Sequence, residues 1–250
     1  RRWFMDRFFI AGFAPLAAVA YYATPQEMVM RLGLIPAALM GVLFPAFASA
    51  FAADRARVGY YFERAAGYLL VVMFPLVLVL AVYASEILEL WLGAEFAANS
   101  AAILQIMLLG ILVNSQARLM NTLTQSEGRA DITARVHLLE LVLYTAALLW
   151  FVPRYGVIGA AWVWAGRTLV DMLIFAGVLQ GRRVLGTGML WKPAAGLAIA
   201  VLVVVVGSLL ASPASRLAYV AGALLCYTLA AFRFARADIR PGAPVAADQT

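Results

Sequence analysis

The sequence predicts an all-α fold, a polytopic transmembrane helix bundle with about eight spans. Of the 250 residues, 65% are hydrophobic and only 13% are charged, whereas a soluble domain carries about 45–50% apolar and about 25% charged residues. The mean hydropathy is +0.90, and apolar stretches of about 20 residues, the length that crosses a bilayer, recur along the chain. We therefore expect the bilayer, rather than one globular core, to organise this chain.

The predicted spans are separated by short breaks that are polar or contain glycine and proline. These breaks contain the sequences ATPQE, ADRARVGYYFER, SEILELWLGAEFAANS, TQSEGRAD, VPRYG, GRRVLGTGMLWK and ASPAS. The final segment, RADIRPGAPVAADQT, is polar and carries proline and glycine, which predicts a disordered tail. We expect spans at about residues 3–22, 26–51, 65–84, 100–120, 132–152, 156–180, 194–211 and 215–234.

Basic residues are frequent in every second break, and this asymmetry predicts the orientation of the chain. Cytoplasmic loops of membrane proteins carry an excess of lysine and arginine. The loops that are poor in lysine and arginine hold only Arg154 and Arg216, and the longest of these loops carries Glu86, Glu89 and Glu95. We expect both ends of the chain to face the cytoplasm together with the rich set, which is Arg55, Arg57, Arg64, Arg129, Arg135, Arg182, Arg183, Lys192, Arg233, Arg236 and Arg240.

The start of the chain and its cysteine content narrow the class further. The chain begins at Arg1 without a methionine and lacks the pattern of a secretory signal, so we expect a fragment whose N-terminal part is absent. Cys226 is the single cysteine, which excludes a disulfide within the chain and a cysteine metal site. The net charge of +6 comes from the excess of basic residues in one set of loops, so it does not indicate a nucleic-acid partner.

Several ionisable residues fall inside the predicted spans, where each costs at least about 2.5–3.5 kcal/mol by insertion scales. Arg167 and Asp171 are four residues apart, so they project from one helix face, and Arg167 lies near the middle of its predicted span. Each pair either neutralises itself and pins two helices together, or lines a solvated cavity. The compact sets are Asp6 with Arg7, Glu27 with Arg31, His137 with Glu140, and Arg167 with Asp171.

Two further residues keep alternative interpretations. Arg118 has no acidic residue within a helical turn and lies near a predicted span end, where it could extend its charged group to the interface or serve function. His137 is the only histidine. With Glu140 three residues later, it could relay a proton or make an interhelical hydrogen bond.

The sequence shows no arrangement typical of covalent catalysis. One histidine, one cysteine and no glycine-rich phosphate loop exclude the usual triads, zinc motifs and nucleotide cradles. The longest outer loop is short and offers only glutamates as ionisable groups. We therefore expect no enzyme activity, no cofactor and no metal site.

Four stretches resemble the polysaccharide-export flippases of the multidrug/oligosaccharidyl-lipid/polysaccharide exporter superfamily. FMDRFFIAGFAPLAAVAYYATPQEMVMRLGLIPAALMGVLFPAFASAF resembles the start of the second half of these proteins. ILELWLGAEFAANSAAILQIMLLGILVNS, NTLTQSEGRADITARVHLLELVLY and PRYGVIGAAWVWAGRTLVDML resemble, in order, an outer loop with its next helix, a cytoplasmic turn and a helix start. The resemblance covers about residues 3–180, and the remainder matches only in hydropathy.

The resemblance implies a two-bundle exporter of which this chain is the C-terminal part. Residues 1–180 would form the second bundle of six spans, whose first span could be truncated, residues 181–234 would form two additional helices, and residues 235–250 a disordered cytoplasmic tail. The missing N-terminal bundle would then be the main protein partner, with a glycan polymerase or other assembly proteins as further partners. The membrane would be the bacterial cytoplasmic membrane.

The activity implied by the resemblance is the movement of undecaprenyl-diphosphate-linked oligosaccharide across the membrane by alternating access. Arginine binds phosphate through bidentate, charge-assisted hydrogen bonds. The candidate substrate-binding residues are Arg7, Arg31, Arg118 and Arg167. The candidate residues for a coupling proton or sodium ion are Asp6, Glu27, Glu140 and Asp171.

Three alternatives stay open at this point. A lipid II flippase shares the lipid diphosphate cargo and differs only in the glycan. A multidrug or cation antiporter of the same superfamily would favour acidic cavity groups. A scaffold that organises glycan assembly without transport would tolerate neutralisation of the charges in pairs.

Overall fold

The computed structural model describes residue 12 and residues 16–239. That part of the chain is helical apart from short turns, which confirms the all-α prediction. In chain order the helices are α2 (Leu16–Leu32), α3 (Leu34–Ala53), α4 (Arg55–Val82), α5 (Ala84–Leu92), α6 (Ala94–Ser126), α7 (Ala130–Gly181), α8 (Thr187–Leu209) and α9 (Pro213–Ile239).

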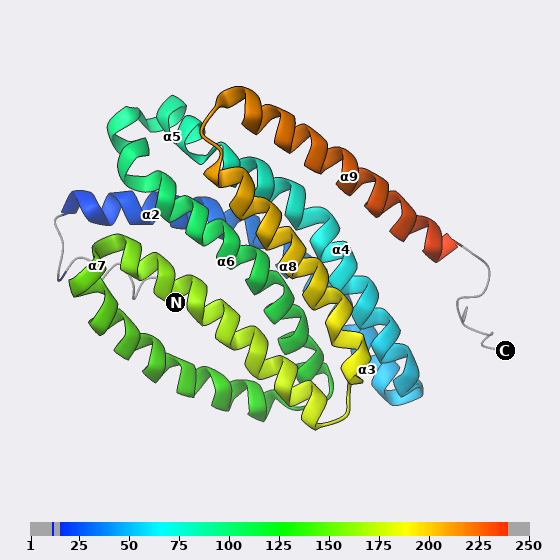
Figure 1. Ribbon diagram of the computed structural model, residues 1–250. Helices are drawn as coiled ribbons and strands as arrows, with labels where there is room; N and C mark the ends of the chain where they lie inside the picture. Colours follow the sequence, from blue (N-terminus) through cyan, green and yellow to red (C-terminus); the bar gives the residue numbers. More distant parts are fainter. Residues whose placement is uncertain (1–11, 13–15, 240–250) are drawn as a thin grey trace.

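The long helices cross the bundle in alternating directions (Figure 1). Six helical stretches of the described chain have the length and composition to cross a membrane. One of them, α7, folds back on itself, so the described chain has one crossing fewer than the predicted eight spans. The predicted first span, residues 3–22, lies largely outside the described residues.

The first helix extends further than the sequence predicts. The ATPQE segment was expected to break the chain after residue 22, but α2 continues through Pro25 to Leu32. Tyr22, Gln26 and Val29 are all buried, and their spacing places them on one face of a helix. Packing of this face against α6 outweighs the missing N–H of Pro25, and the chain bends at Gly33 instead.

The predicted outer loop is also helical. Within it, α5 begins directly after Tyr83, and α6 begins at Ala94, before the predicted start at residue 100. Ala84 and Leu88, one helical turn apart, are both buried, so α5 packs one face against the bundle. Gly93 separates α5 from α6 with φ 90°, a backbone conformation that glycine adopts without strain.

Helix α7 is a hairpin of two antiparallel arms. A straight helix of its 52 residues would measure about 78 Å, more than twice the roughly 30 Å of a hydrocarbon core. At Gly156 the backbone leaves the helical region (φ 60°, ψ −145°), and the second arm returns beside the first (Figure 1). The two predicted spans, 132–152 and 156–180, correspond to these arms, and the VPRYG break shrinks to one non-helical residue.

Helix α6 is the centre of the bundle. It packs against α2, α3, α4, α5, α7 and α8, and most of its side chains are buried. A Cβ at Gly110 would collide with the indole of Trp164 on the second arm of α7. The absence of a side chain there lets the two helices approach closely, and the Thr168 hydroxyl donates to the Gly110 carbonyl at 3.2 Å.

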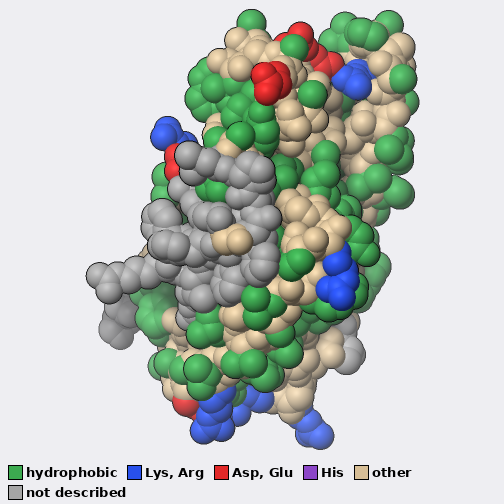
Figure 2. Space-filling view, turned by 90° about the vertical axis from the view of Figure 1, so that its left-hand side faces the viewer, with side chains coloured by type: hydrophobic (Ala, Val, Ile, Leu, Met, Phe, Trp, Pro, Cys, Tyr) green, Lys and Arg blue, Asp and Glu red, His purple; other side chains and the backbone are tan. Residues whose placement is uncertain are grey.

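Opposite ends of the bundle carry opposite charge. Figure 2 shows lysine and arginine side chains gathered at one end of the visible face and acidic side chains near the other. Ion pairs tie the helix ends together: Arg182 to Glu127 at 2.9 Å, Lys192 to Glu63 at 3.2 Å, and Arg216 to Glu86. The pattern of basic and acidic turns found in the sequence therefore corresponds to two ends of one bundle.

At the end of α9 the helix reaches Ile239, beyond the predicted span limit at residue 234. The rest of the predicted tail lies outside the described residues.

We expect Gly156→Ala to destabilise the protein by about 1–3 kcal/mol, because the φ and ψ of Gly156 are unfavourable for any residue with a Cβ. Space is not the obstacle, since a Cβ there would meet no atom within 4 Å. Gly166→Ala, on the second arm, is the matched control and should be neutral or stabilising, because Gly166 is helical and also has open space. Thermal unfolding in detergent measures both variants, and equal melting temperatures would contradict the argument.

Candidate functional site

A row of polar side chains follows one face of α6 and defines the candidate site. Asn114, Arg118, Asn121 and Gln125 are spaced by four, three and four residues, which places them on one side of the helix. The Gln125 amide donates to Asn121 Oδ1 at 2.9 Å, and Arg118 Nε donates to Asn114 Oδ1 at 2.8 Å. This row faces residues of α7.

An ion pair joins the two arms of α7. Arg167 Nη1 on the second arm donates to Glu140 Oε1 on the first arm at 3.3 Å. Glu140 is 5% exposed and Arg167 is 18% exposed. The Arg167 guanidinium also lies 5.6 Å from the ring centroid of Tyr144. Because a buried charge is costly unless it is paired, this contact supports the hairpin itself.

His137 connects the ion pair to the row on α6. Its Nδ1 lies 3.1 Å from Glu140 Oε2, and its Nε2 lies 3.4 Å from Asn121 Nδ2. Asn121 Oδ1 accepts a second hydrogen bond, from the Thr133 hydroxyl at 2.9 Å. The His137 ring packs edge-on against Phe175, with 6.2 Å between the ring centroids. The hydrogen bonds therefore run without interruption from α6 to both arms of α7.

Arg118 and Asp171 complete the arrangement. Arg118 is half-buried and lies within Coulombic range of Arg167 and Asp171. Asp171 is only 7% exposed. We call Arg118, Asn121, His137, Glu140, Arg167 and Asp171 the polar cluster. With a neutral histidine, the two arginines balance the two carboxylates, so the polar cluster carries no net charge.

The structure brings together four of the eight predicted site residues. Arg118, Arg167, Glu140 and Asp171 meet in the polar cluster, although they come from two different helices. Glu27 and Arg31 are exposed on α2. The other two, Asp6 and Arg7, lie outside the described residues.

The structure adds two neighbours that the sequence does not identify. Arg118 donates to Asn114, and its acidic neighbour Asp171 comes from another helix. Asp171 is only four residues from Arg167 in the sequence. The ion pair of Arg167 with Glu140, by contrast, joins residues that are 27 positions apart. Local spacing could not identify either contact, because the turn at Gly156 creates both neighbourhoods.

Four members of this hydrogen-bonded network were missed: Asn114, Asn121, Gln125 and Thr133. The signal for the three on α6 was present, because their spacing with Arg118 repeats at a helical period inside an otherwise apolar span. Thr133 lies on another helix, and only the packed structure brings its hydroxyl to Asn121.

Three members of the polar cluster offer atoms that metals bind. One ligand atom each from His137, Glu140 and Asp171 lie within 4.8 Å of one another. Both oxygens of Glu140 already accept hydrogen bonds, from Arg167 and His137. Because two arginines stand beside this group, a divalent cation would have to break the ion pair and enter a site without net negative charge.

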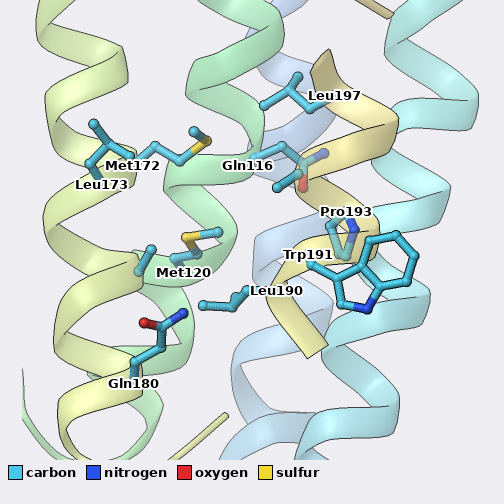
Figure 3. Close-up of a pocket in the computed structure, with 11 residues that line it drawn as sticks. Gln116, Met120, Met172, Leu173, Gln180, Leu190, Trp191, Pro193 and Leu197 are labelled. Carbon is cyan, nitrogen blue, oxygen red and sulfur yellow. The ribbon is translucent and has the colours of Figure 1, made fainter. Parts of the chain in front are cut away.

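A separate cavity lies on another face of α6, between α6, the second arm of α7 and α8 (Figure 3). Its volume is about 280 Å³, and its lining is mostly apolar, including Met120, Met172 and Leu197. Its polar lining groups are neutral, principally the amides of Gln116 and Gln180. Because no charged side chain lines it, the polar cluster is the better candidate for a charged ligand.

We expect Glu140→Leu to destabilise the protein by about 3–5 kcal/mol, because it leaves Arg167 partly buried without its carboxylate. The double variant Glu140→Leu/Arg167→Leu should recover most of this loss, since two apolar side chains can replace a buried ion pair. Chemical denaturation in detergent measures the free energy of unfolding. Additive losses in the double variant would show that the two side chains are not coupled.

Three comparisons with known proteins agree with this architecture. Residues 4–101 match a family model described as "Polysaccharide biosynthesis protein". A curated protein of Shigella flexneri, described as "Putative O-antigen transporter", is 32% identical over 175 residues, which cover 68% of this chain and 40% of that protein. The chain therefore spans less than half the length of this relative.

The fold is similar to that of "Lipid II flippase MurJ, inward closed conformation". The TM-score is 0.65, the sequence identity is 16%, and the match covers 92% of this chain and 50% of that chain. At this identity the likeness concerns the fold alone. With its apolar helices, this chain is a multi-pass membrane protein, and its matched family model and its O-antigen transporter relative support a place in the multidrug/oligosaccharidyl-lipid/polysaccharide exporter superfamily.

Proposed function

We propose that the protein containing this chain moves an undecaprenyl-diphosphate-linked oligosaccharide from the inner to the outer leaflet of the bacterial cytoplasmic membrane. The observation that carries the proposal is the polar cluster, which holds two arginines among membrane-spanning helices. The printed descriptions of the relatives, an O-antigen transporter and a polysaccharide biosynthesis family, support the same class of cargo.

The chemistry of the cargo explains the residues. A diphosphate and its sugars need a hydrated, polar route through the hydrocarbon core, because unsatisfied polar groups are costly there. Arg118 and Arg167 would bind the diphosphate, since guanidinium groups match phosphate geometry and remain charged. The carboxylates of Glu140 and Asp171 hold this positive charge while no cargo is bound, and the diphosphate would replace them as the anionic partner.

Two further arginines belong to the proposal through the resemblance. Arg31 is exposed on α2, so it is accessible to a ligand that approaches that helix. Arg7 precedes the part of the chain that the structure describes.

The same exchange provides a place for a coupling ion. When a phosphate takes over Arg167, Glu140 loses its cationic partner and gains affinity for a proton or a sodium ion. Asp171 is the second carboxylate of the cluster, while Asp6 and Glu27 are candidates on the N-terminal segment. Ion binding at Glu140 would in turn release Arg167 for the cargo, which couples the two events.

Transport by alternating access fits a chain that would supply one of two helix bundles. The chain covers half of the flippase whose fold it shares, so the opposite wall of a central cavity would come from the remainder of the protein. Rocking of two bundles around a fixed site requires no covalent catalysis. In this proposal the basic end of the bundle faces the cytoplasm.

The test is complementation in a strain that lacks its own oligosaccharide flippase. The full-length protein should restore surface glycan, whereas Arg167→Ala and Arg118→Ala should reduce it at least about tenfold, the factor for loss of one charge-assisted hydrogen bond to phosphate. Arg154→Ala is the matched control and should retain activity, because Arg154 is exposed at the α7 turn, and its hydrogen bond and its cation–π contact are both with Trp150.

The outcomes separate the competing functions. Restored glycan with both variants active at equal membrane abundance would remove the arginines from the transport route. Activity that survives Glu140→Gln/Arg167→Gln would favour a scaffold. Rescue of a strain deficient in lipid II transport, but not of the oligosaccharide strain, would assign the protein to lipid II.

A further inference from the structure

We propose that Asn121 is a positioning residue that selects the Nδ1–H tautomer of His137, and that this tautomer keeps Glu140 oriented toward Arg167. The tautomer assignment depends only on the structure. Its consequence for cargo binding rests on the proposed function of Arg167.

The orientation of the Asn121 amide is the first step. Asn121 Oδ1 accepts hydrogen bonds from the Gln125 amide and from the Thr133 hydroxyl, both at 2.9 Å. An amide oxygen has two lone pairs, so these two donors use its full capacity. The amide nitrogen therefore points the other way, toward His137 Nε2 at 3.4 Å.

The amide orientation decides the state of the imidazole. Because Asn121 Nδ2 is a donor, His137 Nε2 must be the acceptor and carries no proton. The ring proton then lies on Nδ1, which donates to Glu140 Oε2 at 3.1 Å. A proton on Nε2 would place two donors against each other, so the Nε2–H tautomer is disfavoured.

The surrounding charges do not select the tautomer by themselves. The charged groups around His137 are Glu140 on its own arm, Asp171 and Arg167 on the second arm, and Arg118 on α6. Glu140 accepts from Nδ1 and Asn121 donates to Nε2, so these two direct hydrogen bonds together select the Nδ1–H tautomer.

This arrangement gives Asn121 influence over Arg167 without contact between them. Glu140 accepts one hydrogen bond on each oxygen, from His137 and from Arg167. The opposite tautomer would turn the His137 Nδ1 lone pair toward Glu140 Oε2, and the resulting repulsion would rotate the carboxylate away from Arg167. Asn121 thereby keeps the ion pair closed until cargo or an ion competes for it.

His137 is the single histidine of this chain. In the full-length protein, labelled with ¹⁵N-histidine and reconstituted in bilayers, its imidazole nitrogen signals are identified by solid-state NMR as those that His137→Gln lacks. At about pH 8 we expect the Nδ1–H pattern, with a protonated Nδ1 and an unprotonated Nε2. A protonated Nε2 in the native protein at this pH would overturn the proposal.

Asn121→Asp tests the cause. It replaces the donor facing Nε2 by an acceptor of the same size, so the Nδ1–H pattern should be lost and Nε2 should become protonated. Asn99→Asp is the control, because it makes the same chemical change on α6 at an exposed residue bonded to the Glu95 carbonyl. Unchanged histidine signals in Asn121→Asp, or equal changes in both variants, would assign the tautomer to something other than Asn121.

The NMR result is independent of the transport assay. If the histidine signals follow the expectation while Arg167→Ala still exports glycan, the tautomer assignment stands and the proposed role of Arg167 fails. If glycan export requires Arg167 but the native histidine carries its proton on Nε2, the proposed function stands and the role of Asn121 fails.

Discussion

The requirement that a charge within a membrane-spanning helix have a partner is the constraint on which this structure depends. Glu140 and Arg167 are 27 residues apart, and only the reversal of α7 brings them into contact at 3.3 Å. The same reversal places His137 and Asp171 beside them and aligns both arms with the polar face of α6. A single backbone conformation at Gly156 therefore determines whether five ionisable side chains are compensated or isolated.

Helix α6 separates two environments within one bundle. The face with Arg118 and Asn121 joins the hydrogen-bonded polar cluster, whereas the face with Gln116 and Met120 lines an apolar cavity beside α8. The approach of α6 to the second arm of α7 is close because Gly110 presents no side chain to Trp164. One helix thus organises both the polar interior and the apolar packing, and this explains why it is the most buried of the long helices.

Sequence reasoning predicted the class of fold and most of the crossings, because hydropathy and charge asymmetry report directly on the bilayer. It also selected four members of the polar cluster, since an ionisable residue inside a span is conspicuous. It placed the first break wrongly at Pro25, where packing of Tyr22 and Val29 overrides a local helix breaker. It could not pair Arg167 with Glu140 or Arg118 with Asp171, because such pairs depend on which helices become neighbours rather than on spacing along one helix.

The near-continuous helicity of α7 has a consequence for how the chain enters the membrane. The two arms are joined by one non-helical residue, so they are suited to insertion together as a preformed hairpin. The first arm brings Glu140 and His137 before the second arm, with Arg167, is synthesised. Separate partitioning would expose each charge to lipid at a cost of about 2.5–3.5 kcal/mol on insertion scales, whereas joint partitioning neutralises them on entry. Because the first arm is synthesised first, joint partitioning requires its charged residues to stay out of the lipid until Arg167 has been synthesised.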